Sequence, residues 1–228
     1  MKIAFMASDA VAIPAIESVW KNPKTELVAI VSNPDKPKGR GGKVSPNDVS
    51  AWAVSHGVLL LRPEKSPDKD VIEALKNAGV ECVVVMAYGR ILKEEFLNFA
   101  PLGCFNLHGS ILPELRGASP IETAIALGKT STGVSLMRIV KKMDAGDVAD
   151  VVETEISPRE TGKSLREKIG IDAARLLERN FDKIAEKTLV FTPQKEENAT
   201  YSRKISKSDL YLYFSKGARE LYLRIRAF

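Results

Sequence analysis

Two polar side chains, Asn106 and His108, alternate with the apolar residues Phe105 and Leu107 in a segment that has the composition of a β-strand. Because successive side chains of a strand point to opposite faces, Asn106 and His108 are predicted to share one face. The sequence that follows is rich in glycine, serine and proline and predicts a loop. We therefore expect the amide and the imidazole to lie where a strand ends at solvent.

A carboxylate that could complete this site stands downstream, at Asp144 in a short turn sequence. An amide, an imidazole and a carboxylate suit a reaction that passes through a tetrahedral intermediate. In that reaction Asn106 would stabilise the oxyanion, His108 would transfer a proton, and Asp144 would orient the imidazole. Since the chain has only two histidines, His108 is easily singled out, with a structural histidine as the alternative.

Short apolar runs alternate with amphipathic segments over the first two thirds of the chain. The predicted strands are 2–7, 26–32, 59–62, 82–87 and 103–107, and the predicted helices between them are 12–20, 47–56, 68–77 and 93–99. Continuous apolar runs such as 83–86 are typical of strands buried on both faces of a parallel sheet. The pattern predicts an α/β fold with a doubly wound, mostly parallel sheet, in which ligands bind at the carboxyl ends of the strands.

The last third of the chain predicts a different organisation. A helix at 121–127 precedes two β segments at 133–140 and 149–156, and one long amphipathic helix is expected over 161–184. A polar connector and a final amphipathic helix at 215–228 follow. We predict one domain over 1–190, a linker over 191–207, and a short C-terminal extension over 208–228 that resembles the start of a further domain.

Composition limits the partners and the location. The chain of 228 residues has 34 basic and 29 acidic residues, and no apolar run reaches the roughly 18 residues that span a membrane. Both cysteines lie in predicted core strands, as expected in a reducing compartment. These features predict a cytoplasmic protein with no membrane partner. Two distant histidines and no paired cysteines predict no metal site.

The positive charge is concentrated in one stretch rich in proline and glycine. Four cations without an intervening acid suit contacts with nucleic-acid phosphates, and they are Lys36, Lys38, Arg40 and Lys43. The glycines and prolines predict a mobile surface loop, for which a merely solvated segment is the alternative.

A longer pattern connects these features. It runs from Asn106-x-His108-Gly109-Ser110 through Arg116-Gly117-x-x-Pro120 to Asp144-x-Gly146-Asp147, and it resembles the 10-formyltetrahydrofolate-dependent formyltransferases. The resemblance implies a Rossmann-like formyltransferase domain, a catalytic trio at Asn106, His108 and Asp144, and 10-formyltetrahydrofolate as co-substrate. It also implies two folate-binding segments, which comprise Met86, Ala87, Tyr88, Gly89, Ile91 and Leu92, and Ser110, Ile111, Leu112 and Pro113.

The basic stretch narrows the resemblance to the members that formylate tRNA, in which a similar inserted loop approaches the acceptor stem. This implies formyl transfer to the α-amino group of initiator methionyl-tRNA, for translation initiation. Residues 7–9 differ from the turn that is usual there, and residues 225–228 resemble the opening of a C-terminal barrel, which implies a shortened chain. The alternatives are a formyltransferase for an amino-sugar or nucleotide amine, and a catalytically weak folate- or RNA-binding module.

Overall fold

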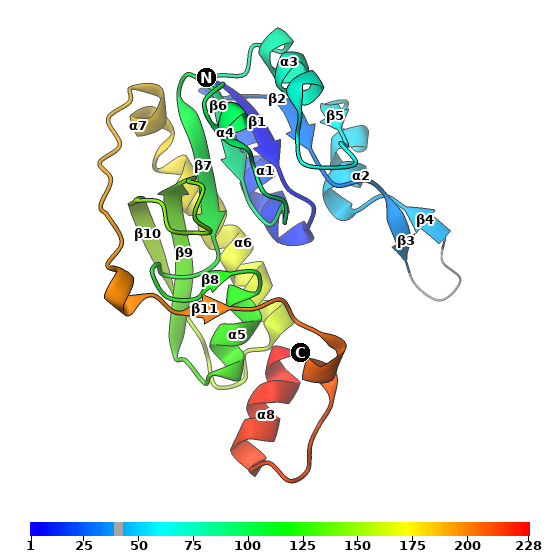
Figure 1. Cartoon of the computed structure of the whole chain (residues 1–228), viewed down its shortest axis with the longest axis vertical. Coiled ribbons are helices and arrows are strands. Elements are labelled where there is room, and N and C mark those ends of the chain that lie inside the picture. The colour runs from blue at the N-terminus through cyan, green and yellow to red at the C-terminus, as the bar shows by residue number, and fades with distance from the viewer. Residues whose placement is uncertain (39–42) are drawn as a thin grey trace.

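A seven-stranded sheet forms the centre of the protein in the computed structural model, which describes residues 1–38 and 43–228 (Figure 1). Its strands follow the order β10 (Val148–Glu155), β9 (Ser131–Arg138), β7 (Gly103–His108), β6 (Cys82–Val85), β1 (Lys2–Met6), β2 (Glu26–Val31) and β5 (Leu59–Leu61). From β7 to β5 all neighbours are parallel, whereas β9 and β10 are antiparallel additions. The predicted α/β fold with a mostly parallel sheet is therefore confirmed.

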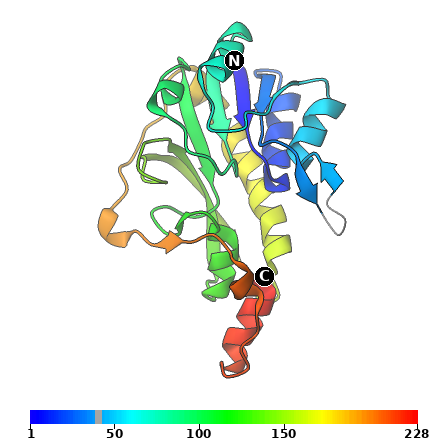
Figure 2. The same ribbon diagram turned by 45° about the vertical axis from the view of Figure 1, so that its right-hand side comes forward.

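Helices cover both faces of this sheet. One face packs against α1 (Ile13–Lys21), α2 (Asp48–Ser55), α5 (Pro120–Ala126), α6 (Gly162–Glu178) and α7 (Phe181–Ala185), and the other against α3 (Lys69–Asn77) and α4 (Glu94–Leu97). Figure 2 shows α6, in yellow, running along the sheet. The side chains of β1 alternate between the two faces of the sheet and so contribute to the core on each face. Ile3 and Phe5 pack in one core, and Ala4 and Met6 pack in the other.

Smaller elements lie outside the main sheet. They are the antiparallel pair β3 (Lys36–Lys38) and β4 (Lys43–Ser45), the parallel pair β8 (Arg116–Gly117) and β11 (Tyr201–Ser202), three 3₁₀ helices (Ala10–Ala12, Glu196–Asn198 and Lys207–Leu210), and α8 (Ala218–Ala227). The basic stretch, which was predicted to be a mobile surface loop, thus contains two short paired strands on either side of residues 39–42.

The long helix expected over 161–184 is two helices. α6 begins with a capping box between Thr161 and Ser164 and ends at Glu178. The break is explained by Asn180, whose Nδ2 donates to the carbonyl of Leu176 at 2.7 Å. A side chain that takes a helix carbonyl competes with the main chain, so the helix stops and α7 begins afresh.

The C-terminal helix α8 packs beside α5 at one end of the molecule (Figure 1). It is held to the segment before α6, because Arg226 Nε donates to the carbonyl of Glu160 at 2.8 Å and Tyr222 donates to the carbonyl of Pro158 at 2.8 Å. The predicted domain boundaries at 190 and 207 stay a prediction. In the described part of the chain, no helix combines the length and the apolar character needed to cross a membrane.

The buried cysteines give a test of the packed core. Cys82 and Cys104 are free thiols inside the sheet, and burial raises the pKa of Cys104 to about 12 and that of Cys82 as well. Because the thiolate is the reactive form, a disulfide reagent at about pH 8 should leave both thiols intact in the folded chain and modify both in guanidinium chloride. Thiol titration measures this, and rapid modification of either cysteine under native conditions would contradict the packing.

Candidate active site

Strand β7 carries Asn106 and His108 through the middle of the sheet. Asn106 pairs with Val85 of β6 on one side and with Met137 of β9 on the other. Phe105 and Leu107 are buried in the core that contains α5 and α6, so the two polar residues point to the opposite face, as predicted. Asn106 is half-buried, and no described residue hydrogen-bonds to its side chain. Its amide N–H is therefore available to an acceptor.

His108 is held in one tautomer by its surroundings. The ring is only 5% exposed, and its Nε2 lies 2.9 Å from the carbonyl oxygen of Leu115. Since a carbonyl can only accept, Nε2 carries a proton, and the lone pair of the neutral ring is on Nδ1. The Oδ2 atom of Asp144 lies 3.7 Å from that Nδ1. A proton taken up at Nδ1 would thus be stabilised by a carboxylate beside it.

Asp144 reaches this position from the turn between β9 and β10. Its backbone is left-handed, with φ of 47°, and its Oδ2 accepts a hydrogen bond of 2.7 Å from the N–H of Gly117. Gly117 itself has φ of 108°, and a Cβ there would lie 2.2 Å from the carbonyl oxygen of Ser202. Glycine is therefore required here, because a side chain would collide with β11 at the position where the N–H reaches the carboxylate of Asp144.

The structure thus brings together the residues predicted to be catalytic. His108 and Asp144 face each other, and Asn106 lies two residues before His108 on the same face of β7. The roles of all three stay a prediction. Among the described residues, no group of three or more histidine, cysteine, aspartate or glutamate side chains could hold a metal ion.

The first predicted folate segment follows β6 and is only partly accessible. Met86 and Tyr88 are each 2% exposed and belong to the two cores, and Leu92 is half-buried. Ala87, Gly89 and Ile91 are exposed, and Ile91 shows 77% of its surface to solvent. An exposed apolar side chain at the carboxyl end of a strand is suited to an apolar ligand. The folate contacts of this segment stay a prediction.

The second predicted folate segment, residues 110–113, forms the loop after β7. Ser135 of β9 anchors it, because its hydroxyl donates to the carbonyl of Ser110 at 2.7 Å and accepts from the N–H of Leu112 at 3.0 Å. Ile111 and Pro113 are half-buried, whereas Ser110 and Leu112 are buried.

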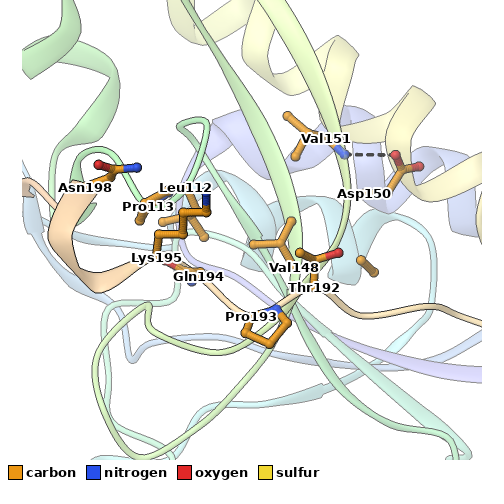
Figure 3. A pocket seen from close by; sticks show the side chains of 11 residues that line it. Leu112, Pro113, Val148, Asp150, Val151, Thr192, Pro193, Gln194, Lys195 and Asn198 are labelled. Atoms are coloured by element: carbon orange, nitrogen blue, oxygen red, sulfur yellow. Dashed lines mark hydrogen bonds between the residues drawn. The ribbon is translucent and has the colours of Figure 1, made fainter.

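Two cavities flank this loop. One, of about 490 Å³, is lined by residues 110–115 together with Lys129 and Asn198. The other, of about 360 Å³, lies between Pro113, Val148 and Lys195 (Figure 3). Neither cavity includes the catalytic candidates or residues 86–92. The two segments attributed to folate binding therefore do not share either of these cavities.

The basic residues lie elsewhere. Lys36 and Lys38 are on β3 and Lys43 is on β4, in a hairpin that projects beside α2 (Figure 1). Arg40 lies outside the described residues. The contact of these four residues with nucleic acid stays a prediction.

Sequence reasoning missed the residues that hold the catalytic candidates in place. The carbonyl of Leu115 fixes His108, the N–H of Gly117 fixes Asp144, and Gln194 contacts the Asp144 turn. Arg116 and Gly117, which form β8, belong to the sequence motif that carried the resemblance, so the motif could have indicated their importance. Gln194 stands in a polar stretch without periodicity, and only the tertiary structure shows it beside the site.

Comparison with known proteins adds an independent finding. Residues 1–179 match the formyl transferase family. The chain belongs to the formyltransferase family. This formyltransferase is 38% identical over 228 residues to the methionyl-tRNA formyltransferase of Sulfurihydrogenibium sp., a match that covers all of this chain and 73% of that relative. It is 36% identical over 228 residues to the methionyl-tRNA formyltransferase of Thermotoga maritima, covering 100% and 72% of the two chains.

A solved structure shows the same fold. It is an N-formyltransferase from Helicobacter canadensis in complex with folinic acid and dTDP-3-aminofucose, with a TM-score of 0.72 and 22% identity. The match covers 100% of this formyltransferase and 80% of the solved chain. This match shows the fold, and the match of residues 1–179 to the formyl transferase family confirms the membership predicted from the motif around β7.

The close approach at Gly117 generates a prediction. Gly117→Ala places a Cβ against the carbonyl of Ser202 and strains a left-handed backbone, so we expect a loss of about 2 kcal/mol or more in the free energy of unfolding. Denaturant titration measures the loss. Gly217→Ala is the matched control, because a Cβ there meets nothing within 4 Å and its φ is −63°. Equal stability of the two variants would contradict the contact between β8 and β11.

Proposed function

We propose that this formyltransferase transfers the formyl group of 10-formyltetrahydrofolate to the α-amino group of initiator methionyl-tRNA, for translation initiation in the cytoplasm. The observation that carries the chemistry is the approach of Asp144 Oδ2 to 3.7 Å from His108 Nδ1, at the strand that also carries Asn106. The choice of acceptor is supported by identities of 38% and 36% over the whole chain with two methionyl-tRNA formyltransferases.

The proposed reaction begins when the amine of methionyl-tRNA attacks the formyl carbon and a C–N bond forms. Asn106 donates its amide N–H to the oxyanion that develops on the formyl oxygen. His108 accepts the ammonium proton at Nδ1, and the carboxylate of Asp144 stabilises the resulting imidazolium. The intermediate then collapses, the bond from carbon to N10 of the folate breaks, and the proton passes to N10.

The accessible parts of the two predicted folate segments define where the donor is proposed to bind. Exposed Ala87, Gly89 and Ile91 would contact the folate, while buried Met86 and Tyr88 would support that segment from the cores. Ser135, through its two hydrogen bonds, would keep the loop at 110–113 in register with β9.

The catalytic assignment is tested by removing each side chain. We expect Asn106→Ala, His108→Ala and Asp144→Ala each to lower turnover at least tenfold, since losing one oxyanion donor alone costs about 2.7–4 kcal/mol of barrier. Formation of acid-resistant formyl-methionyl-tRNA measures turnover, and circular dichroism verifies the fold.

His56→Ala is the matched control for these variants. His56 is the other histidine of the chain, and its ring is stacked on Trp52 of α2. This variant should retain the activity of the unchanged chain. Normal rates in all three site variants would refute the assignment.

The tRNA contact is tested separately. Arg40→Ala should weaken tRNA binding and lower the slope of log affinity against log salt by about one, because one fewer cation displaces counterions from the phosphates. Lys69→Ala, which removes an exposed cation from α3, should change neither quantity. Binding titrations at several salt concentrations measure both, and an unchanged slope for Arg40→Ala would exclude this contact.

The turnover assay also separates the alternative functions, a formyltransferase for another amine and a binding module. Each amine is offered with the same donor: methionyl-tRNA, an amino-sugar nucleotide and a purine-nucleotide amine. A product formed only with the sugar or the nucleotide amine would replace the proposed acceptor. Folate binding without a product from any amine would indicate a binding module.

A further inference from the structure

Gln194 uses its whole amide group to connect two parts of the active site. Its Nε2 donates to the carbonyl of Asp144 at 2.9 Å and to the carbonyl of Gly146 at 2.7 Å. Its Oε1 accepts from Nε and Nη2 of Arg116 at 3.0 and 2.8 Å. Because carbonyls only accept and a guanidinium only donates, the orientation of this amide is determined by its partners.

Gln194 reaches the Asp144 turn because the chain before it is tied to the start of β10. Thr192 and Val148 exchange two main-chain hydrogen bonds, of 2.9 and 3.0 Å. Val148 follows directly after the turn that contains Asp144 and Gly146. The bridge therefore sets the position of Gln194 relative to that turn.

Arg116 provides a rigid base for Gln194. Its side chain is fully buried, and its Nη1 donates to both carboxylate oxygens of Glu196, at 2.9 and 3.2 Å. Arg116 also precedes Gly117, whose N–H holds the carboxylate of Asp144. A closed ring results, in which Gln194 holds the backbone of Asp144, Arg116 holds Gln194, and Gly117 holds the side chain of Asp144.

The geometry points to Gln194 as a positioning residue that keeps the carboxylate of Asp144 beside Nδ1 of His108, 3.7 Å away. This inference rests on the proposed function of the Asn106, His108 and Asp144 site and adds a residue to it. Asp144 has a left-handed backbone, which is uncommon for a residue other than glycine although aspartate tolerates it better than most, so this turn benefits from a restraint. The two donors of Gln194 supply that restraint, on the main chain of the turn.

The first test does not depend on enzyme activity. In the folded chain the N–H of Gly117 is bonded to Asp144, so its hydrogen exchange, followed by NMR, should be slow. Asp144→Ala removes the acceptor and Gln194→Ala lets it move away, so both should speed exchange by about tenfold or more.

Gln194→Glu separates the two sides of the amide. It keeps an acceptor for Arg116 but removes both donors to the turn, so it should speed exchange as much as Gln194→Ala does. Glu197→Ala, in the same exposed segment, is the control and should leave exchange unchanged. Slow exchange in Gln194→Ala would overturn the inference.

The second test is kinetic. Gln194→Ala should lower kcat by about tenfold to a hundredfold, while KM for both substrates stays within about twofold, because a displaced catalytic group affects the transition state more than binding. In an Asp144→Ala background the same change should alter kcat by less than about twofold, since its target is already absent. Equal losses in both backgrounds would show a merely structural role and overturn the inference.

The two tests keep this inference separate from the proposed function. If the unchanged chain fails to formylate methionyl-tRNA but exchange at Gly117 responds as expected, the proposed acceptor is wrong and the positioning role stands. If the chain formylates methionyl-tRNA but exchange at Gly117 is unaffected by Gln194→Ala, the positioning role is wrong and the proposed function stands.

Discussion

The arrangement of the site depends on the buried guanidinium of Arg116. A charge without solvent contact must be compensated inside the protein, and here Glu196, Gln194 and the hydroxyl of Tyr201 do so. Burial alone would lower the pKa of Arg116, but Tyr201 and Glu196 more than offset this and hold the pKa above its usual value. The residues on either side of Arg116, Leu115 and Gly117, hold His108 and Asp144.

This coupling makes one short strand serve two purposes. The charge network keeps β8 against β11. Leu115, just before β8, presents its carbonyl to the imidazole, and Gly117 of β8 presents its N–H to the carboxylate. Lys142 strengthens the connection, since it donates to Glu196 at 2.8 Å from within the turn that carries Asp144. The Lys142 and Arg116 contacts lower the pKa of Glu196, so the carboxylate that compensates Arg116 stays ionised in neutral solution.

Local patterns were sufficient to predict the sheet. The apolar run at 83–86 and the alternation at 105–108 depend only on neighbours in sequence, and β6 and β7 lie where these patterns placed them. The pairing of His108 with Asp144 followed from the chemistry of the residue types and the resemblance. The break at Asn180 could not be predicted, because it depends on a side chain that bonds both a helix carbonyl and Asp150. The contacts of Arg116 could not be predicted either, since they join residues 78 and 80 positions apart.

The ring around Asp144 has a consequence for the moment at which the enzyme becomes competent during its own synthesis. The sheet strands and α6 are complete by Glu178, and domains generally fold as they leave the ribosome. Gln194, Glu196 and the β11 residues emerge afterwards, so a nascent chain can already possess its central layers while Asp144 still lacks its anchors. During synthesis the carboxylate of Asp144 thus gains its anchors only after the residues of the central layers have emerged, once the segment through Ser202 is available.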